Sequence, residues 1–313
     1  MRLVFLGTPS FAVPTLERIA RAGHQVQAVY TQPDRPKGRE QELAPSAVKE
    51  AALGLGLDVR QPERIRRPEV AEELRQLRPE AMVVVGYGQI IPQSIIDIPP
   101  LGIVNVHASL LPRYRGAAPI QWAIACGEVT TGVTTMRIDA GLDTGDILLM
   151  RETPIGPEET AVELAARLSV MGADLLVETL EGLGAGSIEP RKQDGALATH
   201  APILRKDDGE IDWMRTAREV YNRVRGFVPW PGAYSWFRGQ RLHVWRARLA
   251  ETPSAGGAGS LVAAGRRLLV RCGENSCLEL LEVQLEGRRK VRADAFLNGQ
   301  HVQAGEQLGE GTQ

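Results

Sequence analysis

Short apolar stretches alternate with amphipathic segments over the first 150 residues, and this alternation restricts the possible folds more than any other feature of the chain. The apolar stretches predict buried strands, and the segments between them show the spacing of helices with one apolar face. Strands followed by helices in this order predict an α/β domain with an open, mostly parallel, doubly wound sheet. In such sheets the functional site lies beyond the carboxyl ends of the strands. The expected strands cover residues 2–6, 25–30, 81–85 and 103–107, and the expected helices cover 10–22, 46–55 and 69–77.

The pattern changes near residue 184. A long helix is expected over residues 159–182, and residues 184–206 are then rich in Gly, Pro and polar side chains without periodicity. After another helix at 213–227, short strands separated by glycine turns predict a small β-barrel or sandwich. These strands are expected at residues 242–248, 260–262, 268–271 and 278–283. We therefore predict two domains, residues 1–188 and 207–313, joined by a linker at 189–206, in accord with the length of 313 residues.

The charge differs between the two parts of the chain. Residues 1–189 carry 18 Lys and Arg against 24 Asp and Glu, a net of −6, and residues 190–313 carry 19 against 14, a net of +5, which together give the overall −1. A basic second half suggests a polyanionic partner, although the charge difference alone is weak support.

Targeting and metal-binding signals are weak. The apolar run at the start ends at Gly7-Thr8-Pro9, which is too short for a signal peptide, and no apolar run is long enough to span a membrane, so we expect a cytoplasmic protein without membrane contact. The three cysteines are Cys126, Cys272 and Cys277. Their spacing favours a hairpin turn over a zinc site, and we expect no metal.

The chemistry-bearing residues begin on the strand at 103–107. Asn105 and His107 are two residues apart, so their side chains point to the same face of this strand. An amide donor can stabilise a developing oxyanion, and an imidazole can accept or shuttle a proton near neutral pH. These are the two groups that an acyl transfer needs, although such a pair is more often structural.

Two glycine-punctuated loops follow that strand. The first contains Ser109-Leu110-Leu111-Pro112 and ends at Arg115-Gly116, where small residues would allow a ligand to approach closely. The second loop is 141–146, and its Asp143 could orient the histidine and favour its protonated form. Each loop alone could also be an ordinary turn.

Taken together, these motifs resemble the folate-dependent formyltransferase family. The resemblance rests on Asn-x-His, the following Ser-Leu-Leu-Pro-x-x-Arg-Gly and a later Leu-Asp-x-Gly. It implies that Asn105, His107 and Asp143 are the catalytic residues. It also implies that Ser109, Leu110, Leu111 and Pro112 bind the folate, with 10-formyltetrahydrofolate as the co-substrate. The family fold is a Rossmann-like domain followed by an OB-like β-barrel, which agrees with the pattern above.

Within this family the chain is similar over its full length to the members that formylate the methionine of initiator tRNA. Phe5-Leu6-Gly7-Thr8-Pro9, Thr31-Gln32-Pro33-Asp34-Arg35-Pro36 and Phe227-Val228-Pro229-Trp230-Pro231-Gly232 carry this similarity. It implies a loop at 32–42 that contacts tRNA and a tRNA-binding second domain. It implies no protein partner. The tRNA-contacting candidates are Arg35, Lys37, Arg39, Lys206, Arg215 and Arg218.

The chain departs from the family pattern in this loop, where Glu40 and Glu42 stand in place of expected lysines. Ile203 likewise stands where many members have a lysine. Both departures concern tRNA contacts and leave the catalytic positions untouched. Arg215 and Arg218 lie at helical spacing, which fits a phosphate-facing stripe and a solvated helix face equally well.

Three alternatives remain. A related formyltransferase could act on a small amine, such as a glycinamide ribonucleotide or a nucleotide sugar. A dinucleotide-dependent oxidoreductase would need Gly-x-Gly-x-x-Gly after the first strand, but Leu6-Gly7-Thr8-Pro9-Ser10-Phe11 stands there. A non-enzymatic tRNA-binding module would explain the basic second half but would leave Asn105, His107 and Asp143 without a role.

Overall fold

A computed structural model of the chain describes residues 1–37, 42–251, 256–303 and 305–309. They form two compact units. The first unit contains residues 1–119, 130–154 and 165–201, and the second contains 120–129, 155–164 and 202–313. The division therefore crosses the chain more than once, and each unit is described by itself below.

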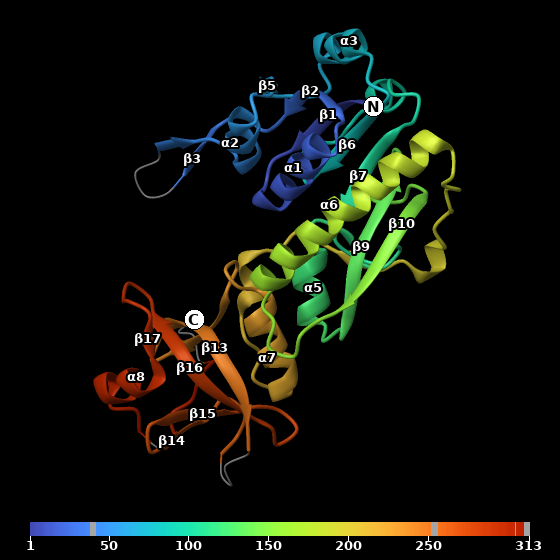
Figure 1. The fold of residues 1–313 in the computed structure, drawn as a ribbon. Helices are drawn as coiled ribbons and strands as arrows, with labels where there is room; N and C mark the ends of the chain where they lie inside the picture. The colour runs from blue at the N-terminus through green and yellow to red at the C-terminus, as the bar shows by residue number, and fades with distance from the viewer. Residues whose placement is uncertain (38–41, 252–255, 304, 310–313) are drawn as a thin grey trace. The chain divides into compact units, whose positions relative to one another are not determined.

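A seven-stranded sheet forms the centre of the first unit (Figure 1). The neighbouring strands β5, β2, β1, β6 and β7 are parallel, whereas β9 and β10 are antiparallel additions beyond β7. The predicted mostly parallel α/β sheet is thus confirmed, with an antiparallel edge that strand–helix alternation did not predict. The strands are β1 (Arg2–Gly7), β2 (Gln25–Tyr30), β5 (Val59–Arg60), β6 (Ala81–Val85), β7 (Ile103–His107), β9 (Thr130–Arg137) and β10 (Ile147–Pro154).

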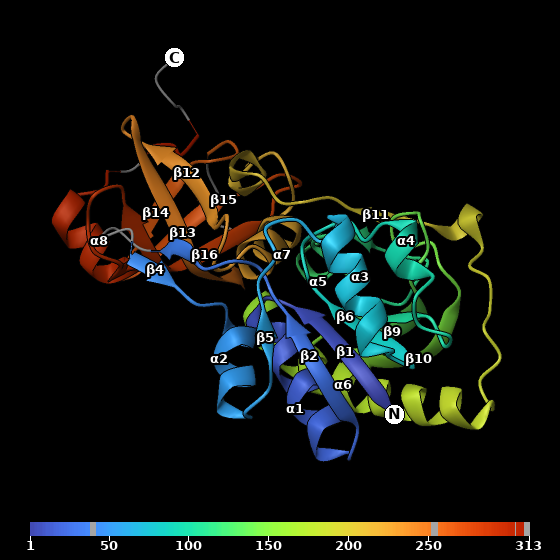
Figure 2. The same ribbon diagram turned by 90° about the horizontal axis from the view of Figure 1, so that it is seen from above.

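Helices cover both faces of this sheet (Figure 2). On one face, α3 (Pro68–Leu77) and α4 (Gln93–Ile96) share a core with Val4, Leu6, Met82 and Val84. On the other face runs α6 (Ala161–Ala185), where a Cβ added at Gly172 would lie only 2.7 Å from Val106 and 3.3 Å from Val133. A glycine at this position therefore lets the helix pack closely against β7 and β9. The remaining helices of the first half are α1 (Val13–Arg21), α2 (Ala47–Gly54) and α5 (Pro119–Ala125), with a 3₁₀ turn at Ser10–Ala12.

The segment of the loop expected at 32–42 contains part of a short antiparallel hairpin, formed by β3 (Arg35–Lys37) and β4 (Glu42–Ala44). Asp34 fastens its base, since its carboxylate accepts from Lys49 Nζ at 2.6 Å and from Gln61 Nε2 at 2.8 Å. Residues 38–41 lie outside the described residues, and Arg39 is one of them.

The segment predicted as a linker is bonded to the first unit over much of its length. Arg191 and Ile147 exchange two backbone hydrogen bonds of 2.8 and 2.9 Å. Further along, β11 (His200–Ala201) pairs in parallel with β8 (Arg115–Gly116). A 3₁₀ turn at Gly195–Leu197 lies between these contacts.

An antiparallel sheet forms the second unit, in the order β12-β13-β16-β15-β14, with β17 paired to β16 (Figure 1). Its core contains Val220 and Val224 of α7, Leu242 and Val244 of β13, and Phe296 of α8. The elements are a 3₁₀ turn at Lys206–Gly209, α7 (Ala217–Gly226), β12 (Ala233–Phe237), β13 (Gln240–Ala250), β14 (Leu261–Ala264), β15 (Arg267–Arg271), β16 (Cys277–Leu285), β17 (Val291–Arg292) and α8 (Ala293–Gln300).

The two ends of this sheet are bridged by a short segment instead of by direct strand pairing. Leu308 N donates to Gly259 O at 2.8 Å, and Gly309 N donates to Trp236 O at 3.1 Å. Among the described residues, no pairing joins β12 to β14. The antiparallel character of the second domain is confirmed, and its closure into an OB-like barrel stays a prediction.

Candidate functional site

Asn105 and His107 lie at the carboxyl end of β7, a central strand of the first unit. Asn105 pairs with Val84 of β6 and Met136 of β9, so the backbone on both sides fixes its position. The His107 side chain is buried, with 5% of the residue exposed. Asn105 is half-buried, and no described residue forms a hydrogen bond with its amide. The amide is therefore available to a bound molecule.

The two ring nitrogens of His107 have different surroundings. Nε2 lies 2.9 Å from the Tyr114 carbonyl oxygen, which can only accept, so Nε2 carries a proton and donates. Nδ1 lies 3.6 Å from Asp143 Oδ2. This second distance exceeds the ordinary range of a hydrogen bond, so Nδ1 is the nitrogen that can exchange a proton with a reactant while a carboxylate stays close.

Asp143 is held on a tight loop at residues 141–145. Its Oδ2 accepts from Gly116 N at 2.8 Å, and its backbone has a left-handed φ of 51°. Two residues later, a Cβ added at Gly145 would stand 1.9 Å from the Arg137 carbonyl oxygen. The glycine that follows the aspartate in the sequence motif is thus required for the loop to pack against the end of β9.

Gln193 holds this loop in place, although it lies 50 residues further along the chain than Asp143. Its Nε2 donates to the carbonyl oxygens of Asp143 at 2.8 Å and Gly145 at 2.7 Å. Its Oε1 accepts from Arg115 Nε at 3.0 Å and from Nη2 at 2.7 Å. The sequence reasoning missed Gln193, because a glutamine in a polar, aperiodic segment carries no local signal. Arg115, in contrast, is the arginine of the Arg-Gly pair that ends the first loop, so the sequence motif could have drawn attention to it.

The predicted folate-binding segment forms a loop directly after β7. Ser109 is fully buried, and its hydroxyl donates to Arg113 O at 2.6 Å. Thr134 of β9 also supports the loop, because its hydroxyl donates to Ser109 O and accepts from Leu111 N. Ser109 and Leu111 therefore shape the loop from inside, whereas Leu110 and Pro112 are partly exposed.

The predicted tRNA-contacting residues fall in separate places. Arg35 is exposed at the base of the hairpin and lies 3.4 Å from Gln32 Oε1, and Lys37 lies on β3. Lys206 and Arg218 are exposed residues of the second unit. Arg215 lies within 3.7 Å of Asp212 and 3.5 Å of Glu219, so its charge is already largely balanced.

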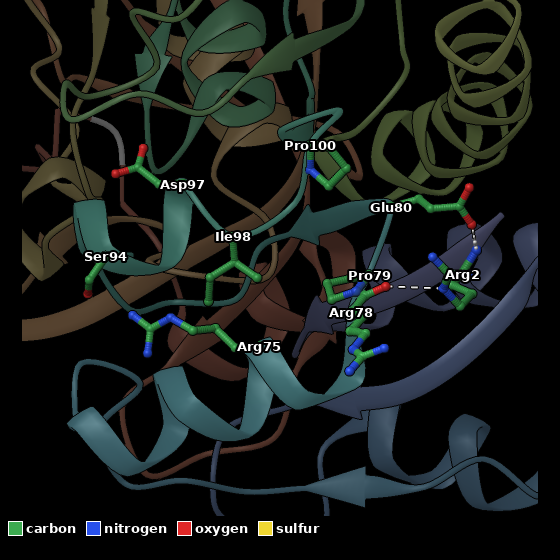
Figure 3. Close-up of a pocket in the computed structure, with 9 residues that line it drawn as sticks. All are labelled: Arg2, Arg75, Arg78, Pro79, Glu80, Ser94, Asp97, Ile98 and Pro100. Carbon is green, nitrogen blue, oxygen red and sulfur yellow. Dashed lines mark hydrogen bonds between the residues drawn. The ribbon is translucent and has the colours of Figure 1, made fainter.

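A hollow of about 520 Å³ opens at the opposite edge of the sheet, where β1 and β6 begin (Figure 3). Arg2 Nε donates to Arg78 O at 3.1 Å, and Arg2 N donates to Glu80 Oε2 at 2.7 Å. The amino ends of parallel strands are not where α/β sheets bind their reactants. We therefore place the functional site at the His107 end of β7 and not in this hollow.

Among the described residues, no cluster of three or more His, Cys, Asp or Glu side chains could hold a metal ion. No helix in the same part of the chain is long and apolar enough to cross a membrane.

Models of known protein families match most of the chain. The sequence model of the family described as formyl transferase matches residues 1–180, and that of the formyl transferase C-terminal domain matches residues 203–301. The chain belongs to the formyl transferase family. The expected resemblance is thereby confirmed, and so is the expectation of a formyl-transferring enzyme.

Relatives of high identity cover the whole chain. A methionyl-tRNA formyltransferase of Solibacter usitatus is 63% identical over 311 residues, which are 99% of this chain and 99% of the relative. The protein of the same name from Koribacter versatilis is 57% identical over 310 residues, again 99% of each chain.

A solved structure supports the fold. The N-formyltransferase from Helicobacter canadensis, in complex with folinic acid and dTDP-3-aminofucose, has a TM-score of 0.68 and 21% sequence identity. The match covers 89% of this chain and 98% of the other. At this identity, the likeness shows a common fold.

Proposed function

We propose that this protein transfers the formyl group of 10-formyltetrahydrofolate to the α-amino group of methionyl initiator tRNA. The observation that carries the proposal is full-length similarity to methionyl-tRNA formyltransferases, at 63% and 57% identity. The convergence of Asn105, His107 and Asp143 at one edge of the sheet supplies chemistry that fits this reaction. A folate donor is supported by the family, and the cytoplasmic location stays a prediction.

The reaction begins when the lone pair of the α-amino nitrogen attacks the formyl carbon. The carbonyl double bond opens, and its oxygen becomes an oxyanion. The Asn105 amide, which has no partner among the described residues, donates to that oxygen. His107 also stabilises the oxyanion when its Nδ1 is protonated, because Nε2 is already committed to Tyr114.

The second half of the reaction restores the carbonyl. The bond between the formyl carbon and N10 of the folate breaks, and the electron pair returns to N10. The proton lost by the amine passes to N10, through His107 Nδ1 or a water held beside it. Asp143, at 3.6 Å from Nδ1, stabilises the positive charge of the imidazolium during this transfer.

The two loops give the folate a defined place. We propose that Leu110 and Pro112 contact its ring system, while Ser109 and Leu111 hold the backbone of the loop in shape. For the tRNA, we propose contacts from the hairpin that carries Arg35 and from exposed basic residues of the second unit, including Lys206 and Arg218.

The test is formyl transfer to charged initiator tRNA, with charged elongator methionine tRNA as the control. We expect product from the initiator only, and thermal protection of the protein by folate but not by NAD. Rapid formylation of a nucleotide sugar or a glycinamide ribonucleotide, with no product from the initiator tRNA, would reject this substrate.

A further inference from the structure

The outer face of the β12–β13 hairpin carries an unusual arrangement of rings and cations. Arg241, His243 and Trp245 alternate along β13, so their side chains lie on one face, and Leu242 and Val244 on the opposite face enter the core. Across the hairpin, Trp236 pairs with Arg241 and Tyr234 pairs with His243. We call Tyr234, Trp236, Arg241, His243 and Trp245 the ring–cation surface; the hairpin is seen in Figure 2.

Aromatic rings hold the Arg241 guanidinium in place. Its central carbon lies 4.6 Å from the ring centre of Tyr234 and 5.2 Å from that of Trp236. The surface continues along β13, where His243 and Trp245 stack with ring centres 5.8 Å apart. A guanidinium that lies on two rings keeps its full charge and loses much of its freedom to move.

Several other arginines of this unit have their charge balanced by carboxylates. Arg238 of the same hairpin pairs with Glu306 at 2.6 Å, and Arg248 and Arg267 both pair with Glu279. Among the described residues, no carboxylate lies within ion-pair range of Arg241, and its buried Nε has no hydrogen-bond partner. The charge of Arg241 is therefore not paired directly, and the nearby carboxylate of Glu210 accepts from Trp236 Nε1 at 3.2 Å.

The positive charge on this surface affects the pKa of its histidine, His243. The pKa of His243 lies below its usual value because of burial first, and then because of the positive charges of Arg241 and Lys206, with Glu286 acting in the opposite direction. Lys206 is exposed, and its positive charge acts on the same histidine. Two cations near a row of rings form an arrangement suited to a phosphate backbone.

We propose that Arg241, held by Tyr234 and Trp236, is a preorganised phosphate contact for the tRNA substrate. A planar guanidinium can bond two oxygens of one phosphate, and prior ordering by the rings lowers the entropy lost on binding. From Arg241 to Trp245 the strand extends roughly 13 Å, which can follow several nucleotides of an RNA strand. This inference rests on the proposed function, since it concerns the binding of the same substrate.

The test compares Arg241→Gln with Arg238→Gln in the full-length protein. Both variants remove one positive charge from the same hairpin, and Arg238 also lies over a ring, that of Phe237 at 4.7 Å, but its charge is paired to Glu306. We expect Arg241→Gln to raise KM for charged initiator tRNA about 5- to 10-fold with kcat within about twofold. Its binding should also depend less on salt, by about one unit of slope. Arg238→Gln should leave KM within about twofold of the wild type.

A third variant, Trp236→Leu, keeps the charge of Arg241 and removes one of the rings that hold it. We expect an intermediate rise in KM and an unchanged salt slope, a result that a purely structural role for Trp236 would not give. Thermal unfolding of each variant checks that the fold is retained.

Binding of uncharged initiator tRNA is measured in parallel, so that the inference and the proposed function can fail separately. If the wild type binds tRNA but does not formylate the charged form, the proposed function is wrong, and the binding series still tests Arg241. If Arg241→Gln binds as the wild type does, or if Arg238→Gln weakens binding equally, the inference is overturned.

Discussion

The centre around His107 and the ring–cation surface around Arg241 are held in place by different means. Around His107, backbone groups fix the side chains: the Tyr114 carbonyl accepts from the ring, and the Gly116 amide donates to Asp143. Around Arg241, side chains fix one another across two strands, through ring contacts of 4.6 and 5.2 Å.

This difference shows what each region must do. A reaction centre needs atoms placed to within fractions of an ångström, and tight loops with left-handed residues supply that precision. A surface that binds a polyanion needs its positive charge in roughly the right place. Aromatic rings that hold a guanidinium supply that position without requiring exact geometry. We therefore expect substitutions in the first region to lower kcat, and substitutions in the second to raise KM.

The largest effect is expected at the reaction centre itself. Replacing His107 or Asp143 by alanine should lower kcat by about 10²-fold or more, because each removes a positioned acid–base group. The measurement is kcat on charged initiator tRNA, with folate-induced thermal protection as the control for folding. Turnover near that of the wild type in either variant would contradict the assigned roles.

The second-largest effect on kcat is expected from a substitution at Gly145. Gly145→Ala should lower kcat by roughly 10- to 100-fold, because the new methyl group would collide with the Arg137 carbonyl and displace Asp143. The matched control is Gly195→Ala, since a Cβ at Gly195 meets no atom within 4 Å. Equal activity of the two variants would show that the position of the loop does not matter.

Gln193 tests whether the segment after residue 188 belongs to the catalytic unit. Gln193→Leu should lower kcat about 10-fold with little change in KM for tRNA, because Asp143 and Gly145 lose the amide that holds their carbonyls. Gln193→Glu keeps an acceptor for Arg115 but not the donor to the loop, so it should be similarly impaired. A rise in KM alone would place Gln193 with the tRNA-binding surface.

The contacts made after residue 188 affect how the separation of chemistry from tRNA binding should be tested. A protein truncated after residue 188 would lose Gln193 and the strand pairing of β11 with β8. Such a fragment could be inactive because its catalytic loops are unsupported. Point variants of the intact chain separate chemistry from tRNA binding without this complication.

The smallest effect concerns stability in the second unit. Glu279 is buried, which opposes its ionisation, but Arg267 and Arg248 outweigh burial and hold the pKa of its carboxyl below the usual value. Its ionised form therefore stabilises the fold above the pKa of the unfolded chain, and this stabilisation is lost as the pH falls through the lower folded pKa. Glu279→Gln should cost about 1–2 kcal/mol at pH 7.

Urea unfolding of the wild type and of Glu279→Gln at pH 7 and pH 3 checks this expectation. The difference between the two proteins should shrink at the lower pH. A difference that is the same at both pH values would mean that packing, and not ionisation, is what the glutamate contributes.

Local patterns were sufficient to predict four of the parallel strands, β1, β2, β6 and β7, but not the short β5. The strand at 103–107 is mostly apolar, and its two polar residues share a face by simple alternation, so the common face of Asn105 and His107 could be predicted from the sequence, whereas their proposed roles came from the resemblance to a family. Asp143 needed the resemblance to a family, because nothing in residues 108–142 shows that the two loops return to one edge of the sheet.

The remaining features depend on contacts between distant residues. β9 and β10 were missed because their threonines and polar residues lack a buried-strand pattern, although β9 is almost wholly buried. Gln193 and Arg241 were also missed, because no local pattern shows what they contact. Gln193 is 50 residues from the loop that it holds, and Arg241 contacts rings on a neighbouring strand.

We propose that the His107 centre sets the rate of formyl transfer and that the Arg241 surface sets the capture of tRNA. Both roles are measured most directly by kcat and KM for charged initiator tRNA in His107→Gln and Arg241→Gln, assayed side by side with saturating 10-formyltetrahydrofolate. We expect a loss of about 10²-fold in kcat with nearly unchanged KM for the first variant, and a 5- to 10-fold rise in KM with nearly unchanged kcat for the second. If the Arg241 variant lost as much kcat as the His107 variant, the separation of the two roles would be refuted.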